Sequence, residues 1–282
     1  MILIKDVSYY VDGKSILKKV NLKLNKGKVY GILGPNGAGK TTLFKALLGA
    51  IKYEGEIFND DGNTLVGKLI EYPAFYPNLS CFENLKLHAS YAQLDACQRN
   101  IDSLLKLVGI FHVKNKKFKS LSMGMKQRLG VAKALMGNPN TLLLDEPTNG
   151  LDPMGIKEMR NLVEKEIRNK NRIVMISSHN LNEISHITDT IIFINNGEII
   201  LEIENEDDTY IIGKVREISN EQKEEITLLT NDKNENIVVL SHKKFEDMSQ
   251  NKTIFMEDIQ YVDLENLYIE LMSLGITEVK TV

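Results

Sequence analysis

Cysteine is scarce in this sequence. Cys81 and Cys97 are the only two among 282 residues, and they lack the paired spacing of cysteine ligands to a metal ion. Two isolated thiols also differ from the dense disulfide framework that holds small secreted proteins together. We therefore expect two reduced thiols with a structural role, and neither a zinc site nor a disulfide scaffold.

Long apolar runs are missing as well. No stretch approaches the roughly 18 consecutive apolar residues that a membrane-spanning helix needs. Residues 1–6 lack the positively charged start and the apolar run of a secretory signal. We therefore expect the chain to be cytoplasmic.

The net charge is small and unevenly distributed. The whole chain carries −3, yet residues 205–282 hold 17 acidic and 8 basic side chains, whereas residues 1–204 hold 21 acidic and 27 basic ones. This change of sign favours a boundary between two units near residue 205. The modest positive charge of the larger unit suits a nucleotide ligand and a location beside a membrane, but it is too weak to indicate a nucleic-acid partner.

The order of the elements predicts an α/β fold. An apolar run at 2–4, a turn at 11–13, and the alternation of Val20, Leu22 and Leu24 with polar residues predict strands at the start of the chain. Residues 74–137 show helical spacing and predict a helical subdomain. An Asn-Asn-Gly turn at 195–197 lies between two strand-like segments and predicts a hairpin. We divide the chain into a main domain at 1–204 and a small α/β appendix at 205–282, built from short strand-like pieces and a terminal helix.

A glycine-rich loop lies between an apolar strand at 29–33 and a helix that stops at Gly49. Glycines are needed because successive backbone N–H groups must point into one concavity around phosphate groups, and the following helix adds its positive N-terminal end. We expect Lys40 to reach the β- and γ-phosphates and the Thr41 hydroxyl to bind Mg²⁺. The residues predicted to hold the nucleotide are Gly34, Pro35, Asn36, Gly37, Ala38, Gly39, Lys40, Thr41 and Thr42. This loop by itself predicts a nucleoside triphosphate ligand and no particular class of enzyme.

Two carboxylates stand at the end of the apolar strand at 142–145. Asp145 closes that strand, so its side chain emerges at the C-terminal edge of the sheet beside the phosphate loop, where it can hold Mg²⁺. The side chain of the next residue, Glu146, points in a different direction from that of Asp145, and it is the best general base for an attacking water. The alternative is an acidic pair that only caps the next turn, which the Pro-Thr-Asn-Gly-Leu-Asp segment at 147–152 disfavours.

The octapeptide Leu-Ser-Met-Gly-Met-Lys-Gln-Arg at 121–128 predicts a second anion site. Ser122 offers a hydroxyl, Gly124 leaves the backbone N–H groups flexible, and a helix N-terminus follows. Because the chain already has a phosphate loop, this second site is best used on a nucleoside triphosphate held by a partner. Ser122 is also suited to cap the helix, and one residue can do both.

The phosphate loop, the octapeptide and the segment at 142–152 together resemble the Walker A, signature and Walker B motifs of the ABC (ATP-binding cassette) ATPases. The resemblance covers about residues 2–204. It implies a P-loop NTPase core with an antiparallel β-subdomain and a helical subdomain. It also implies that the signature of one cassette closes over ATP held by another, with Asp152 at the interface between them.

The same resemblance implies roles for two further residues. His179 follows two serines at a strand end and matches the family's switch histidine, which touches the γ-phosphate. Tyr10 fits the aromatic residue that stacks on adenine, while the neighbouring Tyr9 and a role for Tyr10 in the core are alternatives.

One position departs from the usual pattern of the family. Glu71 stands where ABC ATPases usually have glutamine, in the loop between the core and the helical subdomain. Its carboxylate can contact Mg²⁺ and adds negative charge near the γ-phosphate. Glu71 and the segments at 75–79, 123–130 and 262–268 together resemble the corresponding parts of the ATP-binding subunits of bacitracin- and lantibiotic-type peptide exporters.

The resemblance implies an ATPase subunit that powers a membrane transporter and exports an antimicrobial peptide for immunity or resistance. The implied cofactors are ATP and Mg²⁺. The implied partners are a second cassette, in a homodimer, and a separate transmembrane permease that holds the chain on the inner face of the cell membrane.

Two other functions are less consistent with the sequence. A soluble ABC ATPase that acts on ribosomes or DNA usually has two cassettes in one chain or long coiled coils, whereas this chain has one cassette and no sustained heptads. An ordinary P-loop phosphotransferase would leave the octapeptide and the Ser-Ser-His segment unexplained.

Overall fold

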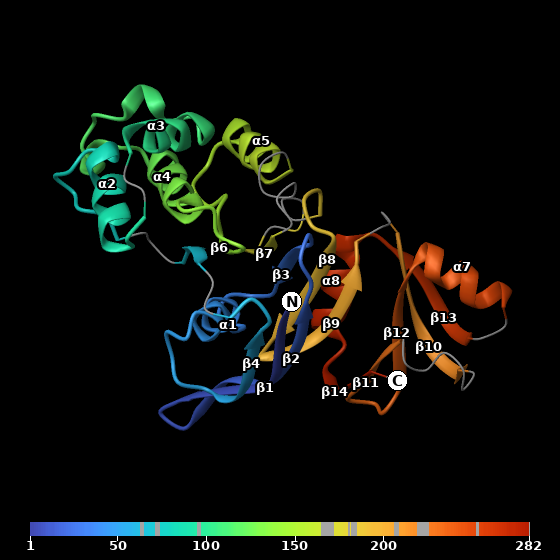
Figure 1. Ribbon diagram of the computed structural model, residues 1–282. Coiled ribbons are helices and arrows are strands. Elements are labelled where there is room, and N and C mark those ends of the chain that lie inside the picture. The colour runs from blue at the N-terminus through green and yellow to red at the C-terminus, as the bar shows by residue number, and fades with distance from the viewer. Residues whose placement is uncertain are drawn as a thin grey trace.

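A computed structural model of the chain has a central sheet between a helical region and a second sheet (Figure 1). The structure describes residues 1–62, 65–70, 74–94, 97–164, 172–179, 181, 185–205, 209–218, 226–251 and 254–281. The α/β fold class predicted from the sequence is confirmed.

The central sheet has six strands in the order β5-β6-β7-β3-β8-β9. These strands are β3 (Val29–Leu33), β5 (Val66–Leu69), β6 (Thr141–Asp145), β7 (Ile173–Ser178), β8 (Thr190–Asn195) and β9 (Glu198–Glu204). All neighbours are parallel except β8 and β9. Parallel strands place their carboxyl ends at one edge of a sheet, so the segments that follow β3, β6 and β7 meet there.

The predicted hairpin is confirmed by the antiparallel pairing of β8 with β9. Its turn has positive φ angles at Asn196 (47°) and Gly197 (83°), which asparagine and glycine adopt at low cost. The Gly197 N–H donates to the Ala38 carbonyl at 2.9 Å, and the Gly197 carbonyl accepts from the Lys18 N–H at 2.9 Å. The turn therefore connects the glycine-rich loop to the N-terminal strands.

The N-terminal strands form an antiparallel sheet in the order β2-β1-β4. They are β1 (Ile2–Val11), β2 (Lys14–Leu24) and β4 (Glu54–Asn59). In β2, Val20, Leu22 and Leu24 are buried and the residues between them are exposed, as alternation requires of a sheet with one face in the core. The helix α1 (Lys40–Leu47) packs Leu43 and Phe44 into the same apolar cluster.

The helical subdomain predicted near 74–137 contains three α-helices of the described chain. They are α2 (Cys81–Tyr91), α3 (Gln98–Leu107) and α4 (Met123–Leu135), and α5 (Pro153–Leu162) follows β6. Ser80 and Glu83 form a capping box that starts α2. Neither Cys81, which is buried in this subdomain, nor Cys97, which is exposed, forms a disulfide. No helix in the described ranges is long and apolar enough to cross a bilayer.

The C-terminal region forms its own antiparallel sheet, in the order β13-β10-β12-β11-β14. Its elements are β10 (Tyr210–Ile218), β11 (Thr227–Asn231), β12 (Asn236–Ser241), α7 (His242–Gln250), β13 (Ile254–Val262), α8 (Leu264–Ser273) and β14 (Ile276–Thr281). Sequence reasoning anticipated α8 but not α7. Met248 is the one fully buried residue of α7, so the helix leaves little apolar periodicity to detect.

The C-terminal sheet and the central sheet share a hydrophobic core. Leu267 and Leu271 of α8 are buried in one cluster with Leu33 of β3 and Phe193 of β8. The rings of Phe193 and Tyr268 stack with their centroids 6.3 Å apart. Figure 1 shows α8 lying beside β8 and β9, away from the other C-terminal helix. The C-terminal region is therefore packed against the sheet that carries the glycine-rich loop.

Candidate active site

The glycine-rich loop connects β3 to α1, and two of its glycines have backbone conformations that favour glycine. Gly37 and Gly39 have φ angles of 84° and 110°. Gly34 is required for a different reason, because a Cβ atom there would lie 2.2 Å from the Ile194 carbonyl oxygen. The loop is thus pressed against β8, and α1 begins at its end with an N-terminus suited to anions.

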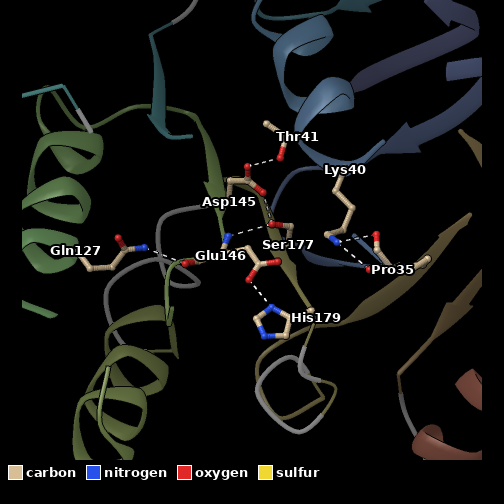
Figure 2. A network of polar contacts seen from close by, with 9 residues as sticks. Pro35, Lys40, Thr41, Gln127, Asp145, Glu146, Ser177 and His179 are labelled. Atoms are coloured by element: carbon tan, nitrogen blue, oxygen red, sulfur yellow. Dashed lines mark hydrogen bonds and ion pairs between the residues drawn. The ribbon is translucent and has the colours of Figure 1, made fainter. Parts of the chain in front are cut away.

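Lys40 folds back over this loop (Figure 2). Its Nζ donates to the carbonyl oxygens of Gly34 at 2.7 Å and Pro35 at 3.3 Å, and its side chain is almost completely buried. Burial lowers the pKa of the Lys40 ammonium below the ordinary lysine value. A phosphate anion would supply the charged partner that two neutral carbonyls do not.

The hydroxyl and the carboxylate that were predicted to bind a metal ion lie together. Thr41 Oγ1 donates to Asp145 Oδ2 at 2.6 Å, and Ser177 Oγ donates to Asp145 Oδ1 at 2.5 Å. The pairing of Asp145 with Ser177 on adjacent parallel strands makes the second contact possible. Oxygen donors of this kind suit Mg²⁺, which is held in nucleotide sites by one or two protein groups and the phosphates of the substrate. The described chain has no cluster of three or more acidic, histidine or cysteine side chains placed to hold a metal ion.

Glu146 follows Asp145 directly and is fixed on all sides (Figure 2). Its N–H donates to Ser177 Oγ at 2.9 Å, and its carbonyl accepts from Gln127 Nε2 at 2.8 Å. Its Oε2 lies 2.5 Å from His179 Nδ1. The φ angle of Glu146 is positive, at 48°, which is uncommon for a residue with a side chain and typical of functional sites.

The structure therefore brings four of the predicted site residues to one edge of the sheet: Lys40, Thr41, Asp145 and Glu146, with His179 at the rim. The Glu146 side chain is 22% exposed and that of His179 is 59% exposed. A carboxylate that is fixed in place yet reachable by water is what a general base requires.

Ser122 and Gly124 lie at the start of α4, the helix whose Gln127 contacts Glu146. The Ser122 hydroxyl accepts from the Met125 N–H at 3.3 Å and caps the helix. A Cβ atom on Gly124 would lie 3.1 Å from Leu151 Cδ2, so the helix start packs against the 150–152 segment. A cavity of about 540 Å³ lies over these residues, lined by both of them and by Asp152, and not by the glycine-rich loop.

Tyr10 lies near the end of β1, with its side chain half exposed. It pairs with Ser15 of β2, while Tyr9 is partly buried and packs against the core. The next residue along β2, Ile16, approaches the glycine-rich loop, because a Cβ on Gly39 would lie 3.1 Å from the Ile16 carbonyl oxygen. The exposed ring near the loop is therefore that of Tyr10, and its stacking on adenine stays a prediction.

Comparison with known proteins identifies the family. Residues 17–149 match the family described as ABC transporter. The chain is 41% identical over 211 residues to the lantibiotic transport ATP-binding protein SrtF of Streptococcus pyogenes, a match that covers 72% of this chain and 91% of that protein. The chain belongs to the ABC transporter family of ATP-binding proteins.

Two further similarities agree with this assignment. The bacitracin transport ATP-binding protein BcrA of Bacillus licheniformis is 40% identical over 208 residues, with 70% of this chain and 68% of that protein covered. A bacterial ABC transporter cassette solved as a dimer has a TM-score of 0.66 and 26% identity, with 73% of this chain and all of that chain covered. As an ABC cassette this chain binds ATP and is an ATPase, and action on ribosomes or DNA is not favoured.

Two residues of the ABC site were not singled out from the sequence. Ser177 and Gln127 both contact Glu146, although they lie 31 and 19 positions away along the chain. Both belong to segments that the sequence did single out, the Ser-Ser-His segment and the octapeptide, but nothing in a single sequence reveals such long-range contacts. Glu71 lies outside the described residues, and its contact with a metal ion stays a prediction.

Proposed function

We propose that this ABC ATPase powers the export of antimicrobial peptides of the bacitracin or lantibiotic type and so protects the cell that makes or meets them. The observation that carries the proposal is the sequence identity of about 40% to two transport proteins, SrtF and BcrA, that are named for such peptides. A transporter ATPase of this kind works with a separate permease, which would hold the chain on the inner face of the cell membrane.

A head-to-tail dimer is part of this proposal. The cavity over Ser122 and Gly124 is lined by the 150–152 segment and not by the chain's own phosphate loop, which favours use of that cavity by a second copy. A related cassette was solved as a dimer. Each ATP would then lie between the phosphate loop of one chain and Ser122 of the other.

The proposed hydrolysis uses the contacts around Asp145 and Glu146. Glu146 accepts a proton from water as the water oxygen bonds to the γ-phosphorus and the bond to the bridging oxygen breaks, which yields ADP and phosphate. Lys40 exchanges its carbonyl contacts for phosphate oxygens and stabilises their charge. Thr41 and Asp145 would hold Mg²⁺, which when bound supplies further positive charge at those oxygens.

Two experiments test this function. The first is purification of the tagged chain from membranes of its own host. A multi-span membrane protein should co-purify, whereas ribosomes or DNA in its place would contradict transport.

The second experiment measures growth inhibition of a deletion strain by bacitracin, a lantibiotic and a non-peptide antibiotic. Sensitivity to a peptide should rise, and the wild-type gene should restore resistance while the Glu146→Gln variant should not. Unchanged sensitivity to both peptides would remove peptide export from the proposal but leave the ATPase activity intact.

A further inference from the structure

We infer that Gln127 is a positioning residue that holds the proposed general base, Glu146, from the signature helix α4. The inference rests on the proposed role of Glu146 in hydrolysis. It concerns a residue of the octapeptide that neither binds phosphate nor caps the helix.

The first support is the way in which the Glu146 backbone is held. Its φ angle of 48° is disfavoured for a residue with a Cβ atom, so the surrounding contacts must maintain it. The Ser177 hydroxyl accepts a hydrogen bond from the Glu146 N–H, and Gln127 Nε2 donates to the Glu146 carbonyl at 2.8 Å. Because a carbonyl oxygen only accepts hydrogen bonds, the Gln127 amide nitrogen must face it.

The second support is the position of Gln127 on α4. Gln127 is only 9% exposed, so bulk water competes little with its contact to Glu146. The next residue, Arg128, forms an ion pair with Glu158 of α5 at 2.6 Å and donates to the Val108 carbonyl at 3.2 Å. Two consecutive residues of α4 thus hold both ends of the segment between Glu146 and Glu158.

The consequence concerns the two halves of the proposed dimer site. Ser122 stands at the start of α4, and Gln127 follows five positions later, roughly 7.5 Å along the helix axis. When Ser122 closes on ATP held by the partner, the same rigid helix carries Gln127 and with it the Glu146 carbonyl. Closure over the partner's ATP and alignment of the chain's own base would then be one movement.

The test compares two variants of matched chemistry in the purified full chain. Gln127→Met keeps the length and volume of the side chain but removes the donor. We expect kcat for ATP hydrolysis to fall about ten- to a hundred-fold, since small displacements of a reacting group have effects of that size, while KM for ATP stays close to that of the wild type. Because the Glu146 carbonyl loses its donor, the melting temperature should fall by a few degrees. Gln98→Met is the control, because Gln98 is exposed at the start of α3, and it should behave as the wild type.

A second substitution separates positioning from packing. Gln127→Glu keeps the shape of the side chain but, when ionised, presents only acceptors to the Glu146 carbonyl, so its kcat should fall at least as far as that of Gln127→Met. A rise in KM for ATP as large as the fall in kcat, together with a steep fall in melting temperature in both variants, would show a purely structural contact and overturn the inference.

Glu146→Gln in the same assay distinguishes the inference from its premise. An inactive Glu146→Gln beside a Gln127→Met of wild-type kcat would overturn only the role of Gln127. An active Glu146→Gln would overturn the base assignment and the inference with it.

Discussion

Replacement of Leu267 by alanine tests whether the C-terminal region and the cassette unfold as one body. The Leu267 side chain is completely buried in α8, in one cluster with Leu33 and Phe193 of the central sheet. Truncation of such a leucine costs about 3 to 5 kcal/mol, from the lost apolar contact and the cavity left behind. At about 2 to 4 °C per kcal/mol for a chain of this size, the melting temperature should fall by at least roughly 6 °C.

Scanning calorimetry with and without ADP checks this expectation. Nucleotide stabilises whatever unfolds together with the phosphate loop, so a single transition should move up with ADP and down with Leu267→Ala. Ile269→Ala is the matched control, because Ile269 lies on the same helix with 56% of its surface exposed, and it should change stability by less than about 0.5 kcal/mol. Two separate unfolding transitions, one shifted by ADP alone and the other by Leu267→Ala alone, would show that the two regions unfold independently. That result would refute the shared core as the link between them.

Three further predictions concern the ATP site. Glu146→Gln should abolish steady-state hydrolysis and leave a dimer that ATP stabilises, seen by size-exclusion chromatography; normal turnover would contradict its role as base. Ser177→Ala removes a donor to Asp145 and an acceptor for the Glu146 N–H. It should therefore lower kcat and reduce the free energy of unfolding, measured by chemical denaturation, by about 1 to 3 kcal/mol. A kcat equal to that of the wild type would argue against a role of this contact in hydrolysis. Tyr10→Trp introduces the only tryptophan of the chain, and its fluorescence should change on ATP binding; emission that ignores saturating ATP would remove Tyr10 from the adenine site.

The architecture of the nucleotide site could be read from local patterns. An apolar strand, a glycine loop and a helix place Lys40 and Thr41, and a second apolar strand ends at Asp145, so parallel pairing alone brings these side chains to one edge of a sheet. The hairpin at Gly197 followed from turn chemistry in the same way.

Contacts between distant segments could not be read in this manner. The apolar stripe of α8 predicts that the helix covers something, but not that it covers β3 and β8 of the cassette. The positive φ angle of Glu146 and its contact with Gln127 depend on how α4 packs against the end of β6, which no local propensity specifies.

The packing of α8 against the central sheet also has a consequence for synthesis of the chain. The strands β3, β8 and β9 leave the ribosome well before Leu264–Ser273, yet apolar side chains on one of their faces are covered by that helix and by the C-terminal strands that flank it in the chain. Until then a nascent cassette exposes Leu33 and Phe193 to other chains, a hazard of aggregation that grows with slow elongation. A ribosome that stalls between residues 204 and 264 would therefore release a product that contains every nucleotide-binding motif and still fails to persist in the cell.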